Sequence, residues 1–102
     1  MVEIIWTSSA LTDLNEIGEF IALDSPKYAE ITVNKIYSRV GILPKSPRIG
    51  RIVPEIQDEN VRELIEGNYR IIYELAPNTI YILTIHHSSR MLRVNPETGY
   101  FT

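Results

Sequence analysis

Three arginines on predicted strands are the residues best suited to chemistry in this sequence. Arg62 and Arg70 lie within two runs of strand-forming residues, and Arg90 lies at the end of a third run. Guanidinium groups on a sheet face can bind a phosphodiester through paired hydrogen bonds, and they can stabilise a phosphorane-like transition state. The structural alternative is that they pair with acidic residues of neighbouring strands. Those acidic residues are Glu63, Glu66 and Glu74.

Two adjacent histidines, His86 and His87, precede Ser88 and Ser89 near the end of the third run. Adjacent strand residues point to opposite faces, so the two imidazoles cannot chelate one metal ion. Metal sites usually add a carboxylate or a third imidazole. No glycine-framed nucleophile elbow surrounds the serines, which we expect to be turn residues. This stretch therefore predicts neither a metal site nor a serine hydrolase.

The composition excludes several further classes of site. The chain has no cysteine, which excludes disulfides, zinc–thiolate sites, iron–sulfur clusters and cysteine nucleophiles. Gly50 and Gly67 stand alone, so there is no glycine-rich phosphate loop. We therefore expect no cofactor. The acidic residues between 55 and 66 are interpreted as a solvated loop and strand edge rather than as a carboxylate site.

The net charge of −3 argues against a protein whose whole surface binds nucleic acid, although most of the basic residues lie between 45 and 93. The first residues carry no basic region ahead of their apolar run, so we do not expect them to be a signal peptide. No stretch approaches the apolar length that spans a bilayer. We expect a single cytoplasmic domain over residues 1–102.

These residues must be positioned by a small set of elements. Residues 2–6 predict a strand, and apolar positions 10, 14, 17 and 21 predict one face of a helix capped by Thr7, Ser8 or Ser9. Ser25 is a natural N-cap and Pro26 suits the first position of a second helix, with apolar positions 29, 33, 36, 40 and 43. The two helices should form an antiparallel hairpin.

Prolines and a glycine between 44 and 54 predict a loop, and three strands follow over 61–65, 69–75 and 80–86. Their short connections predict an antiparallel meander. The last strand is apolar on both faces, with Ile80 and Ile82 on one and Tyr81, Leu83 and Ile85 on the other, so it is covered twice or exposed for a partner. The fold class is α+β: a strand and a helical hairpin packed on a small, mainly antiparallel sheet.

Five segments in this order resemble the RelE/ParE toxin superfamily, which includes plasmid stabilisation systems. Residues 6–14 (WTSSALTDL) resemble its opening W(S/T)xxAxxDL, and residues 21–26 (IALDSP) resemble its helix-to-helix turn IAxxNP. Residues 43–55 (LPKSPRIGRIVPE) resemble its L…P…GR…PE loop, residues 62–73 (RELIEGNYRIIY) its RE…YRIxY strand pair, and residues 85–90 (IHHSSR) its IxHxxR ending.

The resemblance implies a type II toxin with a cognate antitoxin, whose flexible segment wraps the toxin in a hetero-oligomer. ParE-like members poison DNA gyrase, whereas RelE-like members cut mRNA on the ribosome without a metal. For mRNA cleavage, the resemblance implies that Arg62, Arg70 and Arg90 are candidates to bind the phosphate. His86 or His87 could act as the acid or base. Tyr100 could supply a late aromatic side chain.

Three departures from the RelE pattern favour a ParE-like toxin. The chain is acidic, it has Glu66 where a nuclease arginine would fall, and its middle-loop cations are reduced to Lys45, Arg48 and Arg51. Each departure weakens the affinity for a polyanionic ribosome. The alternatives are a ribosome-dependent mRNA endoribonuclease and a degenerate toxin that survives as an antitoxin-binding module.

Overall fold

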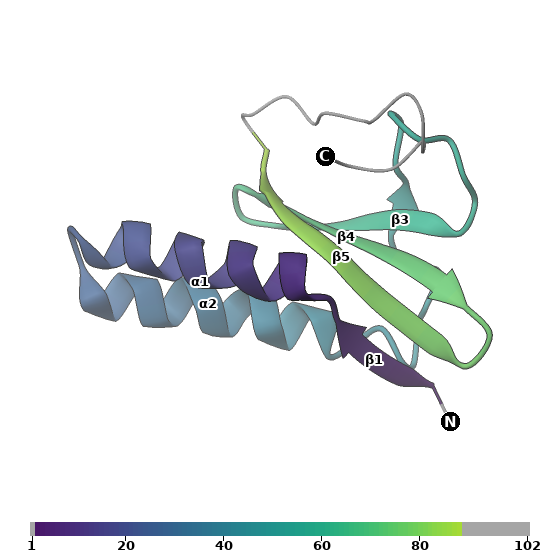
Figure 1. Cartoon of the computed structure of the whole chain (residues 1–102), viewed down its shortest axis with the longest axis horizontal. Helices are drawn as coiled ribbons and strands as arrows, with labels where there is room; N and C mark the ends of the chain where they lie inside the picture. Colours follow the sequence, from purple (N-terminus) through teal and green to yellow (C-terminus); the bar gives the residue numbers. More distant parts are fainter. Residues whose placement is uncertain (1, 89–102) are drawn as a thin grey trace.

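The computed structural model describes residues 2–88, which form two helices and a five-stranded sheet (Figure 1). The elements are β1 (Glu3–Trp6), α1 (Ser8–Ala22), α2 (Pro26–Val40), β2 (Arg51–Ile52), β3 (Val61–Glu66), β4 (Tyr69–Ala76) and β5 (Thr79–His87). The predicted α+β class is confirmed, and the three long strands lie within one residue of their predicted bounds. Neither helix in this part of the chain is long and apolar enough to cross a membrane.

Both helices begin at the predicted caps. The Thr7 hydroxyl accepts a hydrogen bond from the Ala10 amide, and the Ser25 hydroxyl accepts one from the Tyr28 amide. These bonds satisfy donors that a helix N-terminus leaves without partners. Pro26 occupies the first turn of α2, where its missing N–H costs nothing. The two helices therefore form the expected hairpin, which lies on one side of the sheet (Figure 1).

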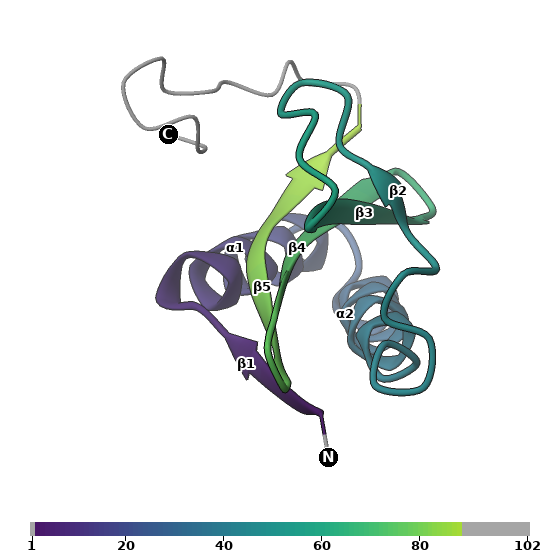
Figure 2. The same ribbon diagram turned by 90° about the vertical axis from the view of Figure 1, so that its right-hand side faces the viewer.

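The sheet has the strand order β1-β5-β4-β3-β2. Strands β3, β4 and β5 form the predicted antiparallel meander, and β1 pairs in parallel with β5, so that Trp6 lies opposite Ile82. The predicted loop contains a strand that the sequence did not reveal, β2, which pairs with β3 at the sheet edge (Figure 2). Two residues between prolines and glycines are too few to show an alternating pattern.

A bulge in β5 changes which side chains face the helices. Ile72 lies opposite Thr84, but the next residue of β4 lies opposite Ile82, so Leu83 has no counterpart. An extra residue in one strand reverses the alternation beyond it. The predicted placement of Ile85 on the same face as Leu83 is therefore wrong, because Ile85 belongs to the core beneath the helices.

Apolar side chains cover both faces of the sheet. The helix-side core consists of Ala10, Leu14, Ile36, Val40, Leu43, Leu64, Ile71, Tyr73, Ile80, Ile82 and Ile85. A smaller cluster on the opposite face joins Val53 of the loop to Val61 and Ile72, with Ile56 and Leu83 packed against it. The segment after β2 thus covers the far face, and the last strand is covered twice, which was one of the two predicted alternatives.

The start of α1 closes the edge of β5 that β1 leaves open, since β1 pairs only with residues 79–82. The Thr7 amide and hydroxyl donate to the Ile82 carbonyl at 3.1 and 2.7 Å. One oxygen of Asp13, Oδ2, accepts from the Ile85 amide at 3.1 Å and from the Thr84 hydroxyl. Side chains of the helix therefore replace a neighbouring strand as partners of these backbone groups.

Candidate functional site

The structure brings two of the predicted site residues together and separates a third. Arg70 and His86 lie opposite each other on β4 and β5, on the sheet face away from the helices. His87 points to the helix side, where its ring meets the edge of Tyr69 at a centroid distance of 5.3 Å. The two histidines therefore lie on opposite faces of β5, as the strand alternation predicted. Arg90, Tyr100 and Ser89 lie outside the described residues.

Arg70 is held by two carboxylates. Its Nη1 and Nη2 donate to the two oxygens of Glu55 at 2.8 and 2.9 Å, which is the bidentate geometry of a strong ion pair. Its Nε donates to Glu63 Oε1 at 2.8 Å, and Nη2 donates to the same oxygen. The hydrogen bonds from Arg70 lower the pKa of the Glu55 carboxyl, and the bonds to Glu55 raise the pKa of Arg70. Every nitrogen of this guanidinium is therefore bound to a carboxylate.

Glu63 lies between two arginines. Its side chain is fully buried, and its second oxygen, Oε2, accepts from Arg51 Nε. The Arg51 side chain is itself 66% exposed, so the buried carboxylate binds a cation that lies at the protein surface. The interpretation of this acidic stretch as a solvated edge is wrong for Glu63. A buried carboxylate is stable here because two cations and their hydrogen bonds compensate its lost hydration.

Arg62 holds the loop that precedes β3. Its Nε donates to the Glu59 carbonyl at 2.9 Å, and its Nη1 donates to the Gly50 carbonyl at 3.0 Å. Both acceptors belong to the polypeptide backbone rather than to an open anion site. The side chain predicted to orient a phosphate thus fastens one loop to the sheet edge.

A buried tyrosine completes the attachment of this loop. The Tyr73 hydroxyl donates to the Pro47 carbonyl at 2.8 Å and accepts from the Gly50 amide at 3.0 Å. Burial raises the pKa of this hydroxyl, which keeps it a donor. A Cβ on Gly50 would lie 2.5 Å from the Glu63 carbonyl oxygen and 2.6 Å from the Tyr73 hydroxyl. Only glycine allows this close approach.

Within residues 2–88, no cluster of three or more histidine, cysteine, aspartate or glutamate side chains could hold a metal ion. No buried side-chain nitrogen or oxygen in that range lacks a hydrogen-bond partner. The arginines on this face act as cross-links between β2, β3, β4 and the loop. The arrangement can fix a surface rigidly, but Arg62 and Arg70 are already engaged and do not converge on a shared open position.

Sequence reasoning missed three members of this arrangement: Arg51, Glu55 and the hydroxyl of Tyr73. The structural alternative for Arg70, pairing with Glu63, was correct. A signal for it lay in the Gly67-Asn68 turn, because a two-residue turn pairs Glu66 with Tyr69 and so brings Arg70 and Glu63 close on one face. Nothing local indicated Glu55, which reaches Arg70 from the loop.

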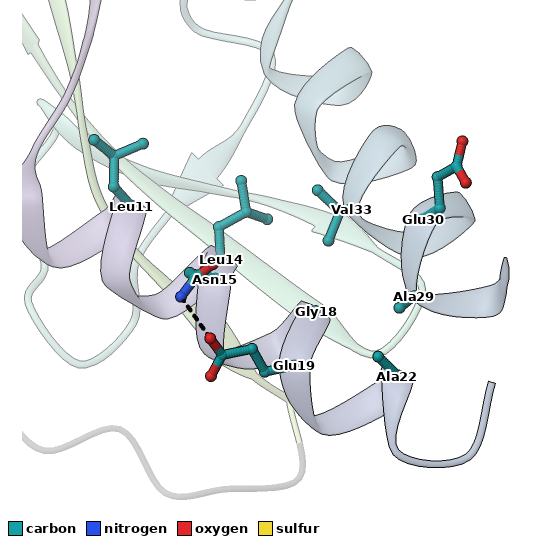
Figure 3. Close-up of a pocket in the computed structure, with 9 residues that line it drawn as sticks. All are labelled: Leu11, Leu14, Asn15, Gly18, Glu19, Ala22, Ala29, Glu30 and Val33. Atoms are coloured by element: carbon teal, nitrogen blue, oxygen red, sulfur yellow. Dashed lines mark hydrogen bonds between the residues drawn. The ribbon is translucent and has the colours of Figure 1, made fainter. Parts of the chain in front are cut away.

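A second feature is an open groove between α1 and α2, with a volume of about 520 Å³ (Figure 3). Its floor and walls are small and apolar side chains, namely Leu11, Leu14, Gly18, Ala22, Ala29 and Val33. A Cβ on Gly18 would lie 3.2 Å from Val33, so glycine lets the helices approach. Its charged lining residues are Glu19 and Glu30, and Glu19 accepts a hydrogen bond from Asn15 at 3.1 Å.

The fold agrees with the comparisons. Residues 4–92 match the family model described as the ParE toxin of the type II toxin–antitoxin system parDE. The chain belongs to this family. It is a toxin of the type II toxin–antitoxin class, and the predicted membership of the RelE/ParE superfamily is confirmed.

Two similar proteins also carry the name of a toxin. The chain is 29% identical to toxin RelE2 of Caulobacter vibrioides, over 89% of this chain and all of that protein. It is 36% identical to a protein named as a toxin, Y4kP, of Sinorhizobium fredii, over 81% of this chain and 84% of the relative.

Two solved structures have the same fold. A chain of the chromosomal ParDE system of P. aeruginosa superposes with a TM-score of 0.72 at 27% identity, over 85% of this chain and 96% of that one. A chain of the RelBE2 toxin–antitoxin complex of Mycobacterium tuberculosis superposes with a TM-score of 0.56 at 21% identity, over 84% and 96%.

Proposed function

We propose that this ParE family toxin stops growth in the cytoplasm by binding a protein target, DNA gyrase, and not by cutting mRNA. One observation carries the proposal: each nitrogen of Arg70 is bound to Glu55 or Glu63. A nuclease needs a cation that is open to the scissile phosphate. Releasing Arg70 would leave Glu63 buried with fewer compensating contacts, which is costly.

The other nuclease candidates within residues 2–88 support the same conclusion. Arg62 donates to two backbone carbonyls, and the two histidines lie on opposite faces of β5. The chain is also acidic, with a net charge of −3, which weakens its attraction to the ribosome. Binding to a protein target requires none of these side chains to be freed.

The same proposal includes a cognate antitoxin, which is supported by the solved relatives from a ParDE system and a RelBE2 complex. We place part of the antitoxin in the groove between α1 and α2. An amphipathic helix would lay its apolar side chains over Leu14 and Val33, with basic residues beside Glu19 and Glu30. Replacing Leu11, which is 52% exposed at the groove, by glutamate should weaken this complex.

The matched control is Leu23→Glu, which places the same charge on a more exposed leucine that does not line the groove. Binding of each purified variant to the antitoxin, measured by calorimetry, separates the two positions. Equal affinity of both variants would mean that the antitoxin does not bind in this groove.

The target is tested by inducing the toxin gene without its antitoxin and following DNA and protein synthesis by pulse labelling. Early arrest of DNA synthesis, together with inhibition of gyrase supercoiling by the purified toxin, is the expected result. Early arrest of protein synthesis with cut mRNA would replace the proposal by the endoribonuclease, for which Arg62, Arg70, His86 or His87, and Arg90 are the candidate residues. If a folded toxin stopped neither process, it would be a degenerate antitoxin-binding module.

A further inference from the structure

The segment between α2 and β3 presents an unusual combination of exposed side chains. Lys45, Arg48 and Arg51 are exposed, as are Ile49 at 52% and Ile52 at 39%. No acidic residue occurs between 43 and 54, although the chain as a whole has a net charge of −3. We call these five exposed residues the basic ridge. It is a positive and apolar surface on an acidic protein.

The basic ridge is held in place by buried anchors. The Tyr73 hydroxyl binds the Pro47 carbonyl and the Gly50 amide, and Arg62 binds the Gly50 carbonyl. Leu43 and Val53, just outside the ridge on each side, have no exposed surface. The backbone between them is thus fixed during folding. A partner that binds the ridge loses little free energy in ordering it.

Arg51 and Ile52 form β2, the outer strand of the sheet (Figure 2). The buried Glu63 carboxylate fixes Arg51 Nε, while the Arg51 side chain as a whole is 66% exposed. The Val53 amide bonds to Val61 of β3, so strand alternation points the amide and carbonyl of Ile52 away from β3. The ridge therefore combines cationic and apolar side chains with the backbone amide and carbonyl of Ile52, which point outward at the sheet edge.

This combination fits a protein surface better than a nucleic acid. Sites for single strands interleave cations with aromatic side chains on which bases stack, and no aromatic residue occurs between 43 and 54. Exposed isoleucines gain nothing beside phosphates, but they can be buried against apolar side chains of a protein. Arginine is enriched at protein interfaces, where it pairs with carboxylates.

We infer that the basic ridge is the surface with which the toxin contacts its target, and that the target presents carboxylates around an apolar patch. This inference rests on the proposed function, since it requires a protein target. It assigns the target to the edge formed by β2 and the antitoxin to the groove between α1 and α2.

The test compares the double substitution Lys45→Glu and Arg48→Glu with a matched control, Lys27→Glu and Lys35→Glu, on exposed positions of α2. Both variants change the net charge equally, and neither changes a hydrogen bond described above. Ile49→Ser tests the apolar part of the ridge. Urea denaturation verifies that all three variants fold. Purified DNA gyrase and a single-stranded RNA oligonucleotide serve as probes, and growth arrest after induction is the cellular measurement.

We expect the Lys45/Arg48 variant to bind gyrase at least tenfold more weakly than the wild type and to lose toxicity, and Ile49→Ser to weaken both. The Lys27/Lys35 control should stay within twofold of the wild type. If the Lys45/Arg48 variant matched the control in both measurements, the inference would be wrong. The inference would also be wrong if the wild type and the control bound RNA while the Lys45/Arg48 variant did not. The ridge would then be a nucleic-acid surface.

The two proposals fail in different ways. A wild-type toxin that arrests growth without binding gyrase would refute the proposed target. In that case selective loss of toxicity in the Lys45/Arg48 variant, with no RNA binding, would still support the ridge. A wild type that neither bound gyrase nor arrested growth would refute the proposed function and, with it, the inference.

Discussion

Arg70 donates two hydrogen bonds to a single oxygen of Glu63, from Nε and from Nη2, and leaves the other oxygen to Arg51. One buried carboxylate thus holds cations from two different strands, β2 and β4. Glu55 adds the loop to the same cluster through its bidentate bond to Arg70. The cluster thus joins β2, β3, β4 and the loop between β2 and β3.

Replacing Arg70 by methionine should cost about 3 kcal/mol of the free energy of unfolding, because it leaves Glu63 buried with only Arg51 as a charged partner. Urea denaturation measures the loss. Adding Glu63→Gln to Arg70→Met should recover part of it, since the uncompensated charge is then removed. Single and double variants of equal stability would show that the cluster does not depend on charge compensation.

The two glycines should respond differently to alanine. Gly50→Ala is expected to lower the free energy of unfolding by about 3 kcal/mol, because the new Cβ would overlap the Glu63 carbonyl and the Tyr73 hydroxyl. Gly67→Ala has open space around it and should cost only about 1 kcal/mol, from its φ of 57°. Thermal or urea unfolding of the two variants shows which one loses more stability. A smaller loss for Gly50→Ala than for Gly67→Ala would contradict the close approach of Gly50 to Glu63 and Tyr73.

Tyr73→Phe keeps the ring in the core but removes the hydroxyl that joins Pro47 to Gly50. We expect a loss of about 2 kcal/mol, since a buried backbone donor and acceptor each lose a partner. Faster hydrogen exchange at the Gly50 amide should accompany it. Tyr37→Phe, at an exposed tyrosine, is the control and should change neither quantity. An unchanged exchange rate in Tyr73→Phe would mean that the hydroxyl does not hold the loop.

The free energy of unfolding should depend on Glu55 at acidic pH. The folded state lowers the pKa of this carboxyl through its bonds to Arg70, so the folded protein binds the proton less readily than the unfolded chain. The contribution of the Glu55–Arg70 pair to the free energy of unfolding is fully present above the pKa of Glu55 in the unfolded chain, about 4.3. It is lost as the pH falls through the lower pKa of the folded state. Urea unfolding between pH 7 and pH 3 should therefore show a shallower acid decline for Glu55→Gln than for the wild type. Parallel curves would contradict the role of this pair.

Features that depend on a few neighbouring residues could be predicted from the sequence. Ser25 and Pro26 specify the start of α2 by their own side chains, and the Gly67-Asn68 turn fixes the pairing of β3 with β4. The helix faces followed from apolar spacing because each helix buries one stripe. These signals lie within one turn of helix or one hairpin, so no knowledge of distant contacts was needed.

Features that depend on distant residues could not be predicted in the same way. The bulge at Leu83 redirects Ile85, and the partners of Arg70 come from the loop as well as from β3. Tyr73 lies in a strand that was predicted, but the role of its hydroxyl depends on Pro47 and Gly50, which lie outside that strand. Each of these contacts exists only after the loop has folded back over the sheet.

The parallel pairing of β1 with β5 joins residues 3–6 to residues 79–82. β5 lies between β1 and β4, and it also accepts a hydrogen bond from Thr7 and donates one to Asp13. During synthesis, the first strand and helix must wait for almost the whole of this domain before they gain these contacts. A translation product that stops before residue 79 lacks the strand with which both β1 and β4 pair. Incomplete chains of this toxin should therefore be harmless to the cell that makes them.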